Sequence, residues 1–242
     1  MVDVLTIGFS SEKNTDEFLD LASLNEYGLR AVGNRIYLDI FTCDEEKLFG
    51  SISEFILKTH EKSSVGHYID RAYNFFTEAE KQMIVDAVIS EKFIENVKPR
   101  LTDVVSSFIK ESRMLDVEGF SNFRLKWLKE VLYRRTDVIA EDIIAKREYD
   151  ELVGMLKYIL ANSVRNSGII LDFSPTDCKI TDLEGLEIDC SSRGHNITEK
   201  DYFIGLLAKM SPEKIIIRNK EYCDDTLMMV ISDVFGKSVI VE

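Results

Sequence analysis

The sequence predicts an α+β (mixed α/β) protein, with a helix-rich middle and a small mixed β-sheet built from its C-terminal and N-terminal segments. Short runs of β-branched and aromatic residues lie near the start of the chain and after residue 167. Between them, apolar residues recur at three- and four-residue steps, which is the period of an amphipathic helix. A strand–helix–strand order with tight joints near the C-terminus predicts a parallel β-α-β crossover.

Residues 1–42 are expected to form a β-α-β or β-α-hairpin unit. The stretch VDVLTIGFS is rich in Val, Leu and Ile and predicts a strand. A helix is predicted next, with Asn14 or Thr15 as its N-cap and Gly28 as its terminator. The weak alternation in RIYLDIF, residues 35–41, predicts a second strand.

The middle segment, residues 43–166, is expected to hold five or six helices packed on one another and on a sheet. One of them should open with a capping box formed by residues 77–80, in which Thr and Glu side chains cap each other's backbone amides. Pro99 and Gly119 are the clearest predicted breaks between helices. Ser121 is expected to cap the helix that follows.

The last segment, residues 167–242, is expected to form one compact domain with the middle segment or a closely packed second one. The predicted order after the strand GIILDFS is a hairpin, a helix, a strand, a helix and a strand. The sequences of the last four are ITEKDYFIGLLAKM, EKIIIRN, DDTLMMVISDVFG and KSVIVE. Thr198 should cap the first helix, Asp224 or Asp225 the second, and Gly236 should end the second.

The hairpin CKITDLEGLEIDC has a register that can be argued from its apolar residues. Ile180 and Ile188 should share the buried face, and they lie opposite each other only if the loop has an odd number of residues. A three-residue loop, 183–185, with Gly185 in the left-handed region, meets this requirement.

The same register places Cys178 opposite Cys190. The pair is interpreted either as two small apolar residues on one face or as a redox-active pair. The four cysteines of the chain include no C-x-x-C spacing, so we expect reduced thiols, no zinc site and a cytoplasmic location.

The composition and net charge of the chain limit the kinds of molecule that it is expected to bind. The chain has 242 residues, of which 45% are hydrophobic and 30% charged, as in ordinary soluble globular proteins. A net charge of −13 opposes attraction to nucleic acid and to anionic membranes. No signal peptide or membrane span is indicated. We therefore expect another protein as the partner; the sequence does not predict the oligomeric state.

Catalytic signatures are missing from the chain. It has no Walker motif and no G-x-G-x-x-G, G-x-S-x-G or H-E-x-x-H pattern, so we favour a protein without enzymatic activity and expect no cofactor or metal. A weaker pattern is the acid-x-Lys of Asp177 and Lys179, which with Asp172 resembles a metal-dependent nuclease strand. The alternative interpretation is a plain strand end and turn.

Two loops carry candidate ligand residues. Arg218 would lie at the carboxyl end of a strand, where open α/β sheets bind ligands, but Asp224 and Asp225 at the following helix start would repel a phosphate. Arg193 and His195 lie in the polar loop SSRGHN beside another helix start. A histidine in such a loop is usually only solvated.

The stretch FRLKWLKEVLYRR, residues 123–135, is a basic island in an acidic chain. On a helical projection its outer basic residues are interleaved with acids, so no continuous basic stripe forms. The outer residues are Lys126, Lys129, Arg134, Glu130, Asp137 and Glu141. The apolar arc holds Leu125, Trp127, Leu128, Val131, Leu132, Val138, Ile139 and Ile143.

Arg124 and Arg135 project within this apolar arc, and Asp142 lies in the same sector. An unpaired charge there would cost several kcal/mol, so we expect carboxylate partners or an exposed cleft. One interpretation is a set of ion pairs that fix the helix register. The other is a site for a ligand or a partner.

The same region resembles a known family. Phe123-Arg124-Leu125, Glu148-Tyr149 and Leu156-Lys157-Tyr158 follow the pattern of the YtxC-like family of proteins, associated with sporulation in spore-forming Firmicutes. The downstream segments ITDLEG, DYFIGLLAKMSP, KIIIRN and KSVIVE follow the same order. The resemblance covers residues 120–242 well and the N-terminal third in outline. It implies a setting in sporulating cells; since the family has no established activity, it provides no catalytic residues to carry over.

The leading hypothesis is therefore a cytoplasmic, non-enzymatic protein-binding factor. The alternative is a metal-dependent hydrolase of phosphoesters that uses Asp172, Asp177 and Lys179.

Overall fold

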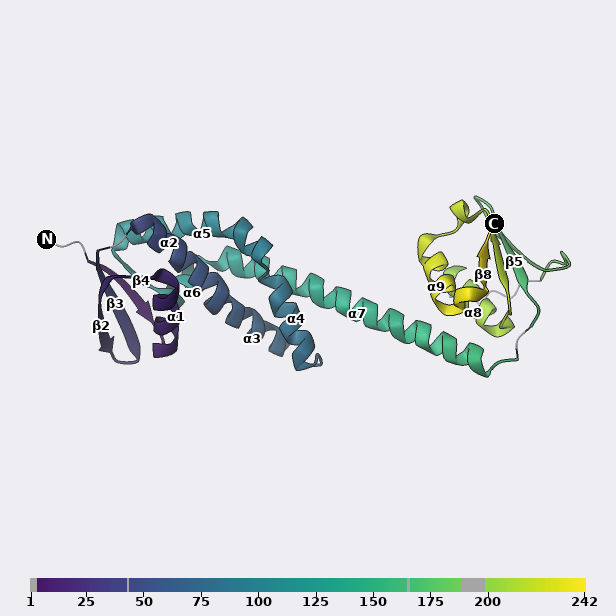
Figure 1. The fold of residues 1–242 in the computed structure, drawn as a ribbon, viewed down its shortest axis with the longest axis horizontal. Helices are drawn as coiled ribbons and strands as arrows, with labels where there is room; N and C mark the ends of the chain where they lie inside the picture. The colour runs from purple at the N-terminus through teal and green to yellow at the C-terminus, as the bar shows by residue number, and fades with distance from the viewer. Residues whose placement is uncertain (1–3, 43, 165, 189–198) are drawn as a thin grey trace. The chain divides into compact units, whose positions relative to one another are not determined.

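The computed structural model describes residues 4–42, 44–164, 166–188 and 199–242. The chain divides into two compact units, residues 1–143 and 144–242, which are described separately. The α+β class is confirmed, because each unit combines helices with a four-stranded mixed sheet (Figure 1). The strands of the two ends thus form two sheets rather than the one predicted sheet.

The sheet of the N-terminal unit contains β1 (Leu5–Phe9), β2 (Glu26–Val32), β3 (Arg35–Thr42) and β4 (Met114–Asp116). Their order is β2-β3-β1-β4, with β1 antiparallel to β3 and parallel to β4. β1 has β3 on one side and β4 on the other, so neither of its edges is open to a strand from the C-terminal segment. The C-terminal strands form a separate sheet. The predicted β-α-hairpin arrangement is present, since α1 (Glu12–Ala22) is followed by the β2–β3 hairpin.

The predicted boundaries of the first helix are wrong. Ser11 caps α1 by accepting a hydrogen bond from the Asn14 amide, so the helix starts earlier than predicted. It also ends earlier, at Ser23, which has a φ of 51°. Gly28 does not end the helix but lies inside β2. Pairing with β3 along the whole of β2 outweighs the local helical period of this stretch.

The N-terminal sheet alternates between a buried and a polar face. The side chains on the buried face are Leu5, Ile7, Phe9, Leu38 and Ile40. On the opposite face, the Asp39 carboxylate accepts hydrogen bonds from the Thr6 hydroxyl and from Arg30 Nε, each at 2.7 Å. The Arg30 guanidinium also lies 4.9 Å from the centre of the Tyr37 ring. This face is therefore built for contact with water.

The helix-rich middle of the chain is confirmed. Its helices are α2 (Glu45–Phe55), a π-helical turn (Ile56–Glu61), α3 (Lys62–Ala72), α4 (Glu78–Val88), α5 (Glu91–Ser112), α6 (Val117–Arg124) and α7 (Lys126–Asn162). The predicted capping box at the start of α4 is present, with the Thr77 and Glu80 side chains each bonded to the other's backbone amide. Here local sequence chemistry alone specifies the helix start.

The predicted breaks in this region are wrong. Pro99 lies inside α5, Gly119 lies in the first turn of α6, and Ser121 is a buried residue within α6. The cap of α6 is Asp116, whose Oδ1 accepts a hydrogen bond from the Gly119 amide at 2.7 Å. The real break falls at the fully buried Leu125, between α6 and α7. The basic island is thus divided between two helices.

The sheet of the C-terminal unit contains β5 (Ile169–Phe173), β6 (Cys178–Asp182), β7 (Ile215–Arg218) and β8 (Val239–Val241). Their order is β6-β5-β7-β8; β6 is antiparallel to β5, and β5, β7 and β8 are parallel. The unit also contains α8 (Glu199–Met210), α9 (Asp225–Phe235) and 3₁₀ turns at Lys220–Tyr222 and Gly236–Ser238. The predicted parallel β7-α9-β8 crossover is confirmed, with Asp224 as the N-cap of α9 and Gly236 at its end.

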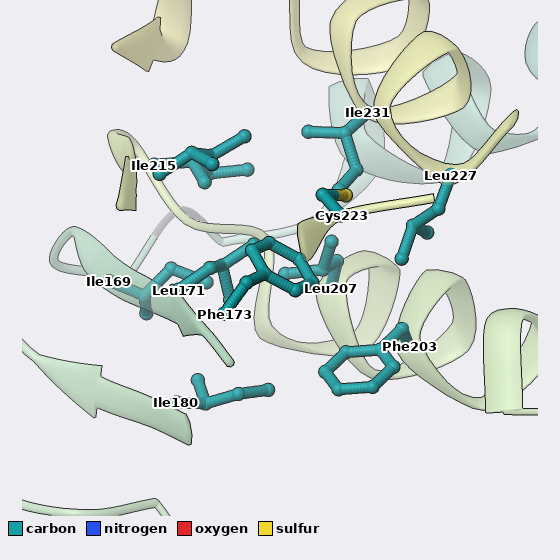
Figure 2. Close-up of a cluster of buried hydrophobic side chains, with 11 residues drawn as sticks. Ile169, Leu171, Phe173, Ile180, Phe203, Leu207, Ile215, Cys223, Leu227 and Ile231 are labelled. Atoms are coloured by element: carbon teal, nitrogen blue, oxygen red, sulfur yellow. The ribbon is translucent and has the colours of Figure 1, made fainter. Parts of the chain in front are cut away.

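One face of this sheet forms the core of the unit with α8 and α9. Figure 2 shows Leu171 and Phe173 of β5 close to Leu207 of α8. Leu227 and Ile231 extend the same cluster from α9. A second cluster joins the end of α7 to the far side of these helices, through Val153, Leu156, Ala208, Val230 and Val234. Both α8 and α9 therefore contribute to the same face of the sheet.

The predicted hairpin register is confirmed. Thr181 forms a bridge with Glu187, and the Ile188 amide donates to the Ile180 carbonyl at 2.9 Å. Gly185 has a φ of 87°, as the three-residue loop requires. Thr198 and Cys190 lie outside the described residues, so the pairing of Cys178 with Cys190 stays a prediction.

None of the helices in the described ranges is both long and apolar enough to cross a membrane.

The loop geometry predicts opposite effects for two glycine-to-alanine substitutions in the C-terminal unit. Gly185→Ala should lower the free energy of unfolding by about 1 kcal/mol, because alanine is strained at a positive φ. Gly154→Ala, within α7 and with open space around an added Cβ, should raise it by about 0.5–1 kcal/mol. Urea unfolding of both variants measures the difference. Equal effects would mean that the loop does not hold Gly185 in the left-handed region.

Candidate functional site

Arg135 of α7 points at the end of another helix. Its Nε donates to the Val88 carbonyl at 3.1 Å, and its Nη2 donates to the Ala87 carbonyl at 3.2 Å. The guanidinium also lies 5.2 Å from the centre of the Phe93 ring in α5. The last carbonyls of a helix lack partners within the helix and carry partial negative charge, so a cation is stabilising there. Arg135 therefore joins α7 to the α4–α5 junction through backbone carbonyls rather than through the predicted carboxylates.

Arg124 and Asp142 are in different surroundings. Both are exposed, and Arg124 is the last residue of α6. Its guanidinium lies 5.7 Å from the centre of the Phe108 ring. Because α6 ends before α7 begins, Arg124 and Arg135 do not share one helix face, and the predicted common sector of Arg124, Arg135 and Asp142 does not exist in this form.

Asp137 is the centre of a cluster that no local sequence pattern reveals. Its Oδ1 accepts hydrogen bonds from the hydroxyls of Tyr68 and Tyr73, each at 2.8 Å. The Tyr68 ring stacks on Tyr133, with 4.3 Å between the ring centres. On the helical projection Asp137 belonged to the solvated face, and its tyrosine partners lie 69 and 64 residues away in the sequence. The cluster joins α3 to α7 through hydrogen bonds and ring stacking.

The residues of the proposed hydrolase site have structural partners. The Asp172 carboxylate accepts a hydrogen bond from Asn219 Nδ2 at 2.8 Å, and Lys179 lies directly opposite Asp172 on β6. Asp177 is in the turn before β6, where its Oδ1 accepts from the Cys178 amide. Within the described ranges, no group of three or more His, Cys, Asp or Glu side chains is arranged to hold a metal ion. This geometry gives the hydrolase hypothesis no support.

The remaining predicted ligand residues lie in or beside loops. Arg218 is exposed at the end of β7, where its Nε donates to the Glu242 carboxylate at 3.1 Å. Asp224 caps α9. This agrees with the capping interpretation of this residue and not with an anion site. Arg193 and His195 lie outside the described residues.

A pocket of about 560 Å³ lies at the carboxyl end of β5. Aromatic and aliphatic side chains and two carboxylates line it. The apolar lining comes from Phe173, Phe203, Tyr222 and Leu227, and the carboxylates are Asp177 and Asp224. Both carboxylates accept hydrogen bonds from backbone amides.

The N-terminal unit has an exposed apolar surface that was not predicted. On β2, Tyr27 and Leu29 lie opposite Ile40 and Leu38 and therefore project from the buried face of the sheet. Leu38 and Ile40 are completely or almost completely buried, but Tyr27 is 41% and Leu29 is 55% exposed. The apolar face of the sheet thus continues onto its edge strand, beyond the area that the helices cover.

A groove of about 370 Å³ runs between this strand and α1. Leu29, Ala31 and Ile36 form its apolar lining, while Glu12 and Asp16 of α1 provide acidic side chains. Arg30, the basic residue among the groove residues that the structure describes, is paired with Asp39 on the other face. The name β2 groove is used below for this surface. One sequence signal could have revealed the β2 groove. In EYGLRAV apolar residues occupy alternate positions, which indicates a strand if Gly28 is not taken as a helix terminator.

The geometry of Arg135 predicts a structural role that mutation can test. Arg135→Met should lower the free energy of unfolding by about 2 kcal/mol, because two backbone carbonyls lose a charged donor. The exposed neighbour Arg134 provides the matched control, and Arg134→Met should change stability by less than about 0.5 kcal/mol. Chemical denaturation compares the two variants. Equal stability of Arg135→Met and the wild type would favour a ligand-binding role for Arg135.

The tyrosine cluster predicts a dependence of stability on alkaline pH. Burial and the hydrogen bond to Asp137 raise the pKa of Tyr73 from 10.0 to about 12. The hydrogen bond to Asp137, with burial, also raises the pKa of Tyr68. The folded protein therefore keeps protons that the unfolded chain releases, so this stabilisation is complete below pH 10 and is lost as the pH rises through about 12.

Asp137→Asn should lower the pKa of both tyrosines, because the carboxylate charge no longer opposes formation of a tyrosinate. NMR titration of the tyrosine Cζ resonances measures this change. Unchanged titration midpoints in the variant would contradict the assigned cause of the shift.

Comparison with known proteins gives one match. The model of the YtxC-like family matches residues 47–240, which is most of the chain and includes most of the helices of both units. No curated protein and no solved structure matches the chain. The match confirms the resemblance found in the sequence and extends it towards the N-terminus. The chain belongs to the YtxC-like family.

Proposed function

We propose that this protein is a non-enzymatic protein-binding factor that acts in the cytoplasm of sporulating Firmicutes. Its partner adds an extended segment to the open edge of β2 and places apolar side chains in the β2 groove. The observation that carries the proposal is the exposure of Tyr27 and Leu29 on the apolar face of an edge strand. The setting in sporulating cells follows from the sequence resemblance to the family.

An edge strand can receive another strand because one row of its backbone amides and carbonyls has no neighbour in the sheet. Proteins usually protect such edges with short strands, charges or proline. At seven residues β2 is not short, and it contains no proline. Its one register irregularity falls at its first residues, 26 and 27, which leaves the rest of the strand regular. Strand addition combines backbone hydrogen bonds with pockets for alternate side chains, and both are available here.

The charges around the groove indicate the chemistry of the partner segment. Glu12 and Asp16 lie along the groove, and Arg30, the cation among the described groove residues, already has a carboxylate partner at 2.7 Å. A segment that alternates apolar residues with Lys or Arg complements this surface in both respects. Electrostatic complementarity of this kind selects partners and speeds association.

The buried thiol of Cys223 is in keeping with the proposed cytoplasmic location. Burial, with Asp224 and Asp225 nearby, raises the pKa of Cys223 to about 11. A thiol with a raised pKa is rarely ionised at neutral pH, so Cys223 contributes to the core and not to redox chemistry.

The groove predicts which substitution abolishes partner binding. Leu29→Asp should reduce capture of the partner from sporulating cells about tenfold or more, because it places a carboxylate in an apolar and acidic groove. Met83→Asp is the matched control, since Met83 is 53% exposed on α4 and Leu29 is 55% exposed. Quantitative mass spectrometry of proteins captured by each variant measures the effect.

The proposal requires a set of proteins that the wild type and Met83→Asp retain and Leu29→Asp loses. Equal capture by all three variants would exclude the β2 groove as the binding surface. Circular dichroism of Leu29→Asp must show the wild-type fold, which is expected because Leu29 is exposed.

A further inference from the structure

The outer face of the C-terminal sheet, opposite the core, carries two rows of side chains that run across the strands. The register places Lys179, Asp172 and Arg218 side by side on β6, β5 and β7. Glu242 follows β8 and continues this row, because its carboxylate accepts a hydrogen bond from Arg218 Nε at 3.1 Å. The charges therefore alternate across the sheet: positive, negative, positive, negative. This set is called the charged row.

The neighbouring row is mainly apolar. It consists of Thr181, Ile170, Ile216 and Ile240, which are paired in this order across β6, β5, β7 and β8. Ile240 is 41% exposed, whereas Ile216 is only 9% exposed at the centre of the sheet. This set is called the isoleucine row. Together the two rows form most of the described outer face.

A sheet of parallel strands is normally covered on both faces, and its strands are then apolar at successive positions. The strands β7 and β8 have this composition, since Ile215-Ile216-Ile217 and Val239-Ile240-Val241 do not alternate. In the described structure, however, the core cluster contains only the inner-face residues of these strands together with α8 and α9. Figure 1 also shows α8 and α9 on the same side of β5 and β8.

The N-terminal sheet provides an internal comparison. The outward positions of its strands β1 and β3 carry Thr6, Tyr37 and Asp39. Asp39 accepts hydrogen bonds from Thr6 and Arg30, and the Arg30 guanidinium lies over the Tyr37 ring. That sheet is adapted to water on its outer face. The C-terminal sheet has isoleucines at the corresponding positions, so its sequence is adapted to a covering layer.

We propose that a second copy of this chain covers the outer face, related to the first by a twofold axis parallel to the strands. Such an axis reverses the order of each row without moving it along the strand. Lys179 then faces Glu242 of the second copy, and Asp172 faces its Arg218. In the isoleucine row, Ile170 faces Ile216. Two sheets stacked face to face in this way lie about 10 Å apart.

The charges favour a second copy at this place in particular. The chain has a net charge of −13, so two copies repel each other in general. The charged row is locally neutral, and its alternation is self-complementary under the proposed axis. A twofold axis perpendicular to the strands would leave the order of charges unreversed, and like charges would lie at the same position across the sheet. The charge pattern therefore selects one orientation as well as one partner.

Two complementary variants test the proposal in the full-length protein. Lys179→Glu with Arg218→Glu makes the charged row entirely negative, and Asp172→Lys with Glu242→Lys makes it entirely positive. Each variant should be monomeric alone, because like charges then face each other across the axis. An equimolar mixture of the two should restore a dimer. Analytical ultracentrifugation at tens of micromolar protein measures the molecular mass in each case.

The control variant is Lys209→Glu with Lys237→Glu, which changes the net charge by the same amount as Lys179→Glu with Arg218→Glu, at exposed residues outside the charged row. The wild type and this control should be dimers, and circular dichroism should show the same fold for all variants. A monomeric wild type overturns the proposal. So does a dimeric row variant or a mixture that stays monomeric.

This surface lies in a different unit from the β2 groove. Leu29→Asp should therefore leave the dimer intact, and the row variants should still capture the partner protein. Failure of one proposal thus leaves the other open to its own test.

Discussion

The constraint on which the structure depends is that, within the described residues, helices cover each sheet on one face only. In each unit, helices cover one side of a four-stranded sheet, and the large apolar side chains gather between them. Such an arrangement is stable when the other face is polar and both edges are protected. The N-terminal sheet has a polar outer face, formed by Asp39 and Arg30, but its edge at β2 is unprotected. The outer face of the C-terminal sheet is not fully polar, because it carries the isoleucine row. Both binding surfaces proposed above are places where this requirement is unmet.

The first half of α7 organises the N-terminal unit around that sheet. Leu128 and Leu132 are completely buried, while Arg135 and Asp137 reach the helices on either side. The positively charged Arg135 caps the end of α4. Asp137 accepts hydrogen bonds from two tyrosine hydroxyls, one within α3 and one directly after it. The charged residues that suggested a binding helix thus hold helices together. Both surfaces that we propose for partners lie on the sheets.

The features that the sequence predicted are those determined by neighbouring residues. The Thr77–Glu80 capping box, the Asp224 cap and the Gly185 turn each follow from chemistry within a few residues. The features that it did not predict depend on distant contacts. The partner carbonyls of Arg135 lie 47 and 48 residues away, and β2 exists because β3 pairs with it. Pro99 and Gly119 were taken as breaks because their helix-breaking tendency is local, whereas tertiary packing and the Asp116 cap keep both within helices. The two rows of the C-terminal sheet were also beyond prediction, since register between β5 and β7 joins residues far apart in the chain.

Hydrogen–deuterium exchange tests the central claim, that a partner segment adds to β2, most directly. The exchange of the full-length chain is measured with and without the partner protein recovered by capture. Strand addition would give the outward-facing amides within Glu26–Val32 hydrogen-bond acceptors, so their exchange should slow when the partner is present. Protection that leaves Glu26–Val32 unchanged and falls on another element would contradict the account.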